Sequence, residues 1–292
     1  MPGVDVLDLV GAILIEQENA LPLTVIEASR RGTLWTNATE YFEFATLLRH
    51  LTVRDLRLRF QNPLLGILWT ILQPLLPAMI FAVVFARVLQ PATGGVPYSL
   101  AALAGFVPWS FFSTSVSSAG MTFVWNANLL NKVYFPRGIL PASAILASSV
   151  ELATGAILLC GWSIWCGFPP CASWLLLPLL AGYIAAFAFF ASLGLATANV
   201  LNRNVKFAVP FAMQLWIYAS PVIYPSSFVT GRWRWLLGLN PLTAVLEGFR
   251  TAIYGAPLDS MLFLMSFCSA IVFATAAVIL FRHFEDLIAE RV

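Results

Sequence analysis

Residues 152–202 carry the strongest signal of fold class in the chain. They read LATGAILLCGWSIWCGFPPCASWLLLPLLAGYIAAFAFFASLGLATANVLN, 51 positions without one Asp, Glu, Lys or Arg. A helix needs about 20 predominantly apolar residues to cross a bilayer, so this run is long enough for two crossings. The turn-forming stretch Gly167-Phe168-Pro169-Pro170 divides it. The run therefore predicts two spanning helices, near 139–165 and 174–200.

The rest of the chain repeats this pattern. Only 10% of the residues are charged and 60% are apolar, whereas a soluble domain has about 25% charged residues. Other uncharged runs cover 60–86, 88–131, 207–231 and 260–281. We therefore predict an all-α polytopic membrane protein in which residues 63–292 form a six-span domain. The six spans are expected near 64–86, 99–124, 139–165, 174–200, 207–224 and 259–281.

The positive charges predict the orientation. Twelve of the sixteen Lys and Arg residues lie in the N-terminal segment, the 125–138 and 201–206 loops and the C-terminal tail, and four lie in the loops on the other side. Cytoplasmic loops carry the excess of Lys and Arg. Both termini are therefore expected in the cytoplasm.

Three segments lie outside the predicted spans. Residues 1–39 are expected to be a cytoplasmic N-terminal extension. In residues 40–62, apolar side chains recur at helical spacing among basic ones, which predicts an amphipathic helix in the headgroup plane. A soluble helix that docks on a partner is the alternative. Residues 225–256 predict two re-entrant half-helices on the external side, the second beginning at Asn240-Pro241 and ending near Gly255.

Several function classes lack their signature. No G-x-x-x-x-G-K-[ST] phosphate-binding motif is present, and the only histidines are His50 and His283. No catalytic residue, metal site or bound cofactor is therefore expected, and a net charge of +2 without a basic run argues against nucleic acid. Glu151, the one charge well inside a predicted span, is compatible with a functional or a packing role. Cys166 and Cys171, which flank one turn, are compatible with a disulfide or with two free thiols.

Aromatic residues are abundant, with 23 Phe, 10 Trp and 7 Tyr. Sugar rings stack on aromatic rings, so aromatic side chains within the spans are candidates to line the path of a glycan. Ordinary core packing is the alternative for each of them. Together with two glutamines in the spans, the candidates are Trp69, Gln73, Phe81, Phe85, Trp109, Phe112, Phe211, Gln214 and Tyr218.

An ordered set of motifs gives a family resemblance. The set comprises Arg54–Phe60 with Asn62–Trp69 and Gln73-Pro74, then Asn131–Arg137, Ser220–Pro225, and Asn240–Leu242 with Glu247–Arg250. In this order the chain resembles the permease subunits of type-2 ABC exporters, which export O-antigens, capsules and teichoic acids. Asn204 departs from the pattern, because an Asp is expected after Arg203.

The resemblance implies partners and a mechanism. The permease would be a homodimer in the bacterial inner membrane, bound to two copies of a cytoplasmic ABC ATPase that holds ATP and Mg. Its substrate would be a lipid-linked polysaccharide. The loop between the second and third spans would couple to the ATPase through Asn131, Lys132, Val133, Tyr134, Phe135, Pro136 and Arg137.

Two more groups of residues receive roles through the resemblance. The external gate would include Tyr224, Asn240, Pro241, Glu247 and Arg250. Three arginines before the first span would attract a pyrophosphate-linked lipid head, or would only satisfy the positive-inside rule: Arg54, Arg57 and Arg59.

Two other functions remain open from the sequence. A permease that exports a small lipid or drug would need no aromatic path. A membrane transferase acting on a polyprenol-linked glycan would need a cluster of external carboxylates, and the outer segments offer only Glu247 and Asp259.

Overall fold

The computed structural model describes residues 44–89, 93–132 and 135–291, and every regular element in these ranges is a helix. The extension 1–39 lies outside the described residues. Within these ranges, five helices are long and apolar enough to cross a membrane. They are α4 (Pro63–Leu89), α5 (Tyr98–Ala119), α8 (Ile139–Trp165), α9 (Leu176–Leu201, preceded by the 3-10 turn η2, Ala172–Leu175) and α13 (Ser260–Arg291). The chain is thus a multi-pass, all-helical membrane protein, and five of the six expected spans coincide with long helices.

The helix at the remaining predicted span is shorter than expected. Residues 207–224 were predicted to cross the membrane, but α10 covers Val205–Ala219, only 15 residues. At about 1.5 Å per residue it is about 22 Å long, less than the roughly 30 Å hydrocarbon core. Its end has a local cause: Ser220 precedes Pro221, and its backbone is extended (φ −106°, ψ 148°).

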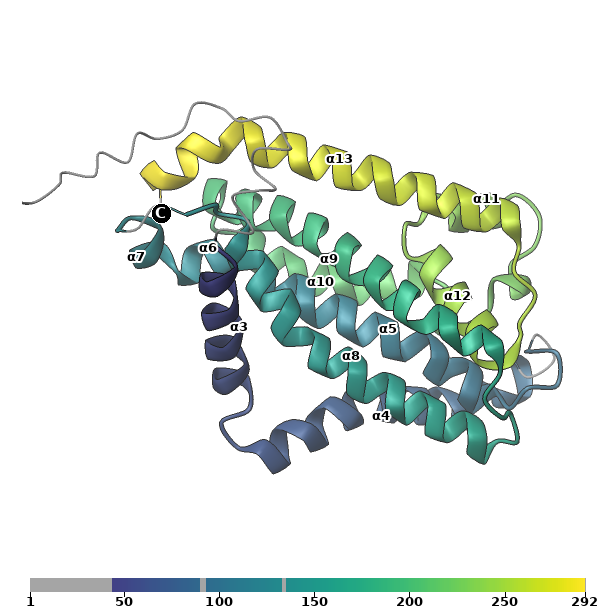
Figure 1. Ribbon diagram of the computed structural model, residues 1–292. Helices are drawn as coiled ribbons and strands as arrows, with labels where there is room; N and C mark the ends of the chain where they lie inside the picture. The colour runs from purple at the N-terminus through teal and green to yellow at the C-terminus, as the bar shows by residue number, and fades with distance from the viewer. Residues whose placement is uncertain (1–43, 90–92, 133–134, 292) are drawn as a thin grey trace, which may run out of the picture. The chain divides into compact units, whose positions relative to one another are not determined.

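Other helix boundaries also differ from the predicted ones. The span predicted at 99–124 ends at Ala119, and two one-turn helices follow it, α6 (Thr122–Trp125) and α7 (Ala127–Leu130). The last span, predicted to end at 281, continues to Arg291. The amphipathic segment 40–62 contains α3 (Ala45–Arg59), which runs across one end of the bundle in Figure 1 rather than along it.

The helix ends divide into two groups. Figure 1 places α3, α6, α7 and the C-terminal end of α13 at one end of the bundle, and α11 (Trp233–Leu239) and α12 (Thr243–Tyr254) at the other. The two short helices predicted in 225–256 are therefore present, after a 3-10 turn η3 (Ser226–Phe228). Gly255 closes α12 in the left-handed conformation (φ 71°), as predicted.

The start of α12 differs from the prediction. Asn240 was expected to cap a helix with Pro241 in its first position, but α12 begins at Thr243, and Leu242 occupies the capping position without a side-chain bond. The reason is a separate turn ahead of the helix. Asn240 Oδ1 accepts the backbone N–H of Leu242 (3.0 Å), and the Asn240 carbonyl accepts that of Thr243 (3.1 Å).

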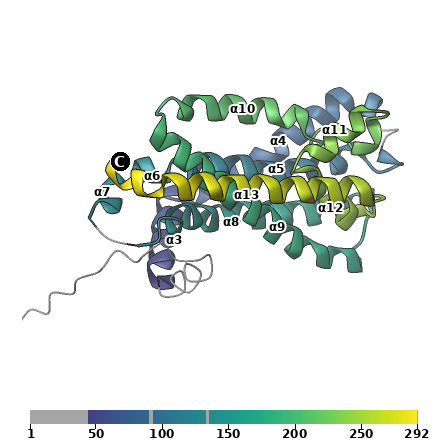
Figure 2. The ribbon, with the colours of Figure 1, turned by 90° about the horizontal axis from the view of Figure 1, so that it is seen from above.

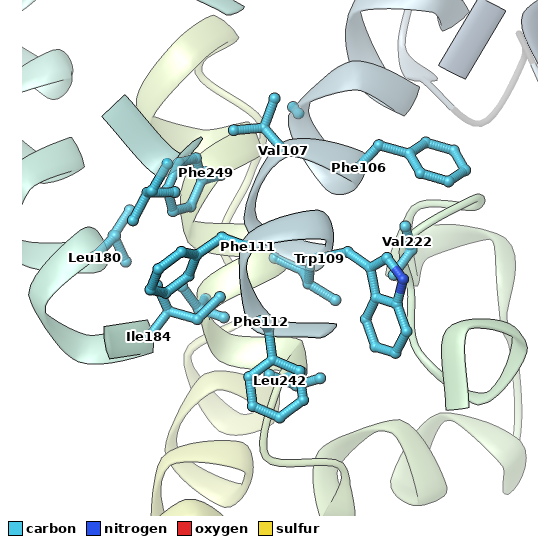
Figure 3. Packing of buried hydrophobic residues seen from close by; sticks show 14 of the residues in the cluster. Phe106, Val107, Trp109, Phe111, Phe112, Leu180, Ile184, Val222, Leu242 and Phe249 are labelled. Atoms are coloured by element: carbon cyan, nitrogen blue, oxygen red, sulfur yellow. The ribbon is translucent and has the colours of Figure 1, made fainter. Parts of the chain in front are cut away.

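Helix α5 is the centre of the core. In the most apolar 18-residue stretch of α5, 78% of the residues are buried, whereas the corresponding share is 17% in α4 and in α13. Helix α5 is therefore an interior helix and the other two are peripheral. Figure 3 shows its aromatic side chains pointing in several directions around the helix, toward α9, α12 and the segment after α10. Phe112 stacks on Phe187 of α9 (ring centroids 5.4 Å apart) and meets Trp216 of α10 edge-on (5.5 Å).

Candidate functional site: the lid segment and the opposite end of the bundle

Residues 220–256, here called the lid segment, enclose a buried ion pair. Glu247 and Arg250 lie three apart on α12, a spacing that puts both on one face of the helix. Arg250 Nη1 donates to Glu247 Oε1 over 2.7 Å, and Arg250 is only 1% exposed. A buried charge pair of this kind persists only when further hydrogen bonds satisfy it.

Backbone groups supply those hydrogen bonds. Arg250 Nη2 donates to the Val222 carbonyl (2.8 Å) and its Nε to the Ala101 carbonyl of α5 (3.4 Å). Glu247 Oε1 also accepts the N–H of Ser226 (3.0 Å). The pair therefore fastens α12 both to the stretch that follows α10 and to α5.

A glycine on α5 makes this approach possible. A Cβ at Gly105 would lie 2.3 Å from the Val222 carbonyl oxygen and 3.0 Å from Arg250 Nη2. Two turns earlier, Tyr98 donates its hydroxyl to the Ile223 carbonyl (2.6 Å). Helix α5 and the 222–223 backbone thus meet without room for a side chain.

Arg250 has one negative partner. Burial is the largest effect on Tyr254 and raises the pKa of its phenol to about 12. Arg250 acts to lower this pKa and Glu247 to raise it, and the phenol stays neutral beside the guanidinium. Glu247 alone balances the charge of Arg250 among the described side chains that contact it.

Asn240, between α11 and α12 of the lid segment, bonds to α10 and to α13. Its Nδ2 donates to Ser220 Oγ (2.7 Å) and to the Ala219 carbonyl (3.1 Å), and its Oδ1 accepts Trp216 Nε1 (3.3 Å). Its carbonyl accepts Ser266 Oγ of α13 (2.7 Å). Ser266 and Trp216 were not predicted from the sequence, since neither lies in a motif and only packing brings them to Asn240.

The remaining gate candidates lie in the same region. The Pro241 carbonyl accepts the Tyr183 hydroxyl (3.1 Å), and Tyr224, half-buried, donates to the Tyr218 carbonyl (3.2 Å). The structure thus brings Asn240, Pro241, Glu247 and Arg250 into one buried polar segment.

The aromatic path candidates do not share one surface in the single chain. Trp109 (6% exposed) and Phe112 (0%) are packed inside the bundle. Phe81 stacks on Phe85 (5.4 Å) and lies beside Phe106 (5.8 Å), and Gln73 donates to Thr114 Oγ1 (2.8 Å). Five of them are exposed on α4 and α10: Trp69, Phe85, Phe211, Gln214 and Tyr218.

At the opposite end, an ion pair joins α3 to α8. Arg59 Nη1 lies 2.9 Å from Glu151 Oε1 and also donates to Ser148 Oγ (3.0 Å). Glu151, whose role the sequence left open, is thus paired with an arginine. Sequence reasoning could not identify this pair, because the two residues are 92 positions apart.

The other two arginines of α3 are placed differently. Arg54 pairs with its neighbour Asp55 (2.9 Å), which also accepts Ser143 Oγ of α8 (3.0 Å). Arg57 is exposed. Beside this junction lies a cavity of about 620 Å³ lined by residues that include Arg54, Arg59 and Asn126.

The described residues of the 131–137 loop differ in exposure. Asn131 and Lys132 are exposed, Val133 and Tyr134 lie outside the described residues, and Phe135 is only 4% exposed. Pro136 and Arg137 are half-buried. Arg137 Nη1 is buried without a hydrogen-bond partner in the described part of the chain. Phe135 therefore anchors the loop, and Asn131 and Lys132 are the exposed residues in its described part.

Comparison with known proteins agrees with this architecture. A family profile described as ABC-2 type transporter matches residues 46–254. Two proteins of Klebsiella pneumoniae named O-antigen export system permease protein RfbA are 25% and 28% identical, over 84% and 77% of this chain and 94% and 88% of theirs. A protein of that name from Myxococcus xanthus is 27% identical over 87% of this chain and 98% of its own length.

The family match covers most of the chain and includes α3 from its second residue, the Arg59–Glu151 and Glu247–Arg250 pairs, and the lid segment as far as Tyr254. It confirms the resemblance drawn from the ordered motifs. The chain belongs to the ABC-2 type transporter family of membrane proteins.

Proposed function

We propose that the chain is the membrane-spanning permease subunit of an ATP-driven exporter that moves lipid-linked or polymeric glycan of the O-antigen class. One observation carries the proposal: three relatives named O-antigen export permeases align with 77% to 87% of this chain and 88% to 98% of their own length. A shared domain alone would leave much of one partner unaligned.

The arrangement of the helices supports six crossings with both termini in the cytoplasm of the bacterial inner membrane. From α4 to α9 successive long helices alternate in direction, whereas α9 and α13 run the same way in Figure 1, so one further crossing is expected between them. Helix α3 and the C-terminal end of α13 share one end of the bundle, which supports an even number of crossings. Helix α10 together with the extended stretch 220–225 supplies the sixth. The lid segment then re-enters from the external face as the outer gate.

Energy would come from a separate subunit. The sequence has no phosphate-binding loop, so ATP and Mg belong on a cytoplasmic ABC ATPase, two copies of which serve two copies of this chain. Asn131 and Lys132 would contact it, and their exposure at the end of the bundle that carries most of the Lys and Arg supports this role.

The glycan would move along α4 and α10 between the two copies. These helices expose Trp69, Phe85, Phe211 and Tyr218, large aromatic side chains that a single chain leaves uncovered. Rings of this kind stack on the C–H faces of successive sugars without holding any one of them tightly. Exposed aromatic side chains on both helices favour a glycan over a small lipid or drug.

The test is to extract the full-length protein gently from its native membrane and identify what co-purifies by mass spectrometry. We expect a stoichiometric ATPase subunit with a phosphate-binding loop. Lys132→Ala together with Asn131→Ala should lose that partner, and Lys206→Ala, a cation outside the coupling loop, should keep it. Recovery of the protein with glycosyltransferases alone would contradict the proposal and favour the membrane transferase.

A further inference from the structure

A polar cavity lies where α9 leads into α10, away from the lid and from the α3–α8 junction. Figure 2 shows this connection at the end of the bundle near α6. The cavity has a volume of about 310 Å³, and its wall is made by Met121, Val124, Ala127, Asn199, Val200, Arg203 and Lys206. Neither the motifs nor the proposed function assigns it a role.

Two of the wall residues are cations without an anionic partner. Arg203 and Lys206 are exposed, and no ion pair or hydrogen bond engages either side chain within the described part of the chain. Lys206 Nζ contacts only the ring of Phe207 (4.8 Å to its centre). Lys206 is also in the first turn of α10, where the free backbone N–H groups add a partial positive charge.

The inner wall holds an unsatisfied acceptor. Asn199, 1% exposed, donates through Nδ2 to the Gly120 carbonyl (2.7 Å), but its Oδ1 is buried without a donor. A buried polar atom without a partner costs stability, so such an atom beside a cavity indicates a donor that occupies it. The neighbouring Asn204 adds no negative charge to the site.

The position of the cavity along the membrane normal indicates which class of ligand it binds. The span formed by α9 ends at Leu201, so Arg203 and Lys206 lie just beyond the apolar core, at the level of lipid phosphates. Lys and Arg at this level attract anionic lipid.

We propose that this cavity binds the head group of an anionic phospholipid that carries a free hydroxyl, as phosphatidylglycerol does. The phosphodiester lies against Arg203 and Lys206, and the hydroxyl donates to Asn199 Oδ1. The inference requires only that the chain spans a membrane, and it stands apart from the proposed glycan substrate.

The test measures lipid retention by native mass spectrometry of the full-length protein in detergent. Dioleoyl-phosphatidylglycerol, dioleoyl-phosphatidylmethanol, which lacks the hydroxyl, and dioleoyl-phosphatidylcholine are the probes. Phosphatidylglycerol should bind most tightly, phosphatidylmethanol next and phosphatidylcholine least. The first two should differ in affinity by about threefold, which corresponds to the loss of one hydrogen bond. Equal affinity for the first two would overturn the role of Asn199.

Variants locate the site. Arg203→Ala with Lys206→Ala should weaken phosphatidylglycerol binding by about twenty-fivefold, at about fivefold per cation. Asn204→Asp, which adds a carboxylate beside Arg203, should weaken it severalfold. The matched control, Arg49→Ala with Arg282→Ala, removes two exposed cations elsewhere and should leave it unchanged.

Three outcomes would overturn the proposal. In the first, the double variant retains phosphatidylglycerol as well as the control does. In the second, millimolar inorganic phosphate displaces the lipid, which identifies free phosphate as the ligand. In the third, the double variant keeps the lipid and loses a co-purifying acidic protein, which makes the cavity a protein-docking surface.

Discussion

The two ends of the bundle each hold an ion pair between an arginine and a glutamate, but the pairs do different things. In the lid segment Glu247 and Arg250 come from one helix, and backbone groups of other segments satisfy them. At the other end Arg59 and Glu151 come from two helices, α3 and α8, and serine hydroxyls surround them.

The difference predicts different consequences. The side chain of Arg250 is 1% exposed and that of Arg59 is 23% exposed, so water screens the charge of Arg59 more than that of Arg250. Loss of the lid pair should disrupt the packing of the lid against α5. Loss of the α3–α8 pair should release α3 and leave the bundle intact.

The largest effect is expected for Arg250→Met. The change leaves Glu247 buried without its counter-charge and removes the donors to the Val222 and Ala101 carbonyls. We expect a loss of about 3–5 kcal/mol in the free energy of unfolding, measured by chemical denaturation in detergent. Glu247→Gln added to Arg250→Met should recover part of it. Equal stability of the wild type and the single variant would contradict this account of the lid.

The next effect concerns the 131–137 loop. Phe135→Ala should cost about 3 kcal/mol, because the ring is 4% exposed and its removal leaves a cavity. Lys132→Ala, on an exposed neighbour, should leave the melting temperature unchanged. Thermal unfolding of both variants in the same detergent is the measurement. An unchanged melting temperature for Phe135→Ala would show that the ring faces a partner instead of the core.

A smaller effect is expected at the contact between α5 and the lid. Gly105→Ala would push a methyl group against the Val222 carbonyl, and overpacking of this kind costs about 1–3 kcal/mol. Gly161→Ala in α8 is the control, since no atom lies within 4 Å of its added Cβ. Alanine is the better helix former, so the control should unfold no earlier than the wild type. Equal destabilisation of both variants would refute the close contact.

The smallest effect is expected at the junction of α3 and α8. Arg59→Ala should cost about 1 kcal/mol overall, because the pair is partly exposed. Amide hydrogen exchange in α3 should become about five- to tenfold faster, while exchange in α5 stays unchanged. Arg57→Ala, on an exposed arginine of the same helix, is the control. Unchanged exchange in α3 would mean that the pair does not hold the helix in place.

Local patterns predicted much of this architecture. Charge-free runs located five long helices, and Gly255 marked the end of α12. Glu247 and Arg250 could be predicted to share one face of a helix, because they are three residues apart. Each of these features depends only on residues that are close together in the sequence.

Long-range packing accounts for what was missed. The pair of Arg59 with Glu151 and the contact of Asn240 with Ser266 join residues far apart in sequence, and no local pattern marks them. The sequence also does not show which aromatic side chains are buried. Phe112 and Phe211 have similar apolar neighbours in the sequence, yet Phe112 is 0% exposed and Phe211 is 63% exposed. The end of α10 was placed too late because apolar residues continue past Ser220, where the following proline ends the helix.

The proposed export of a lipid-linked glycan can be tested directly in cells. The measurement compares the amounts of lipid-linked glycan on the cytoplasmic and external faces of the inner membrane in a strain lacking the gene, with and without a plasmid copy. The account predicts that the glycan accumulates on the cytoplasmic face without the gene and reaches the external face when the wild-type copy is restored. An unchanged distribution in the strain that lacks the gene would contradict it.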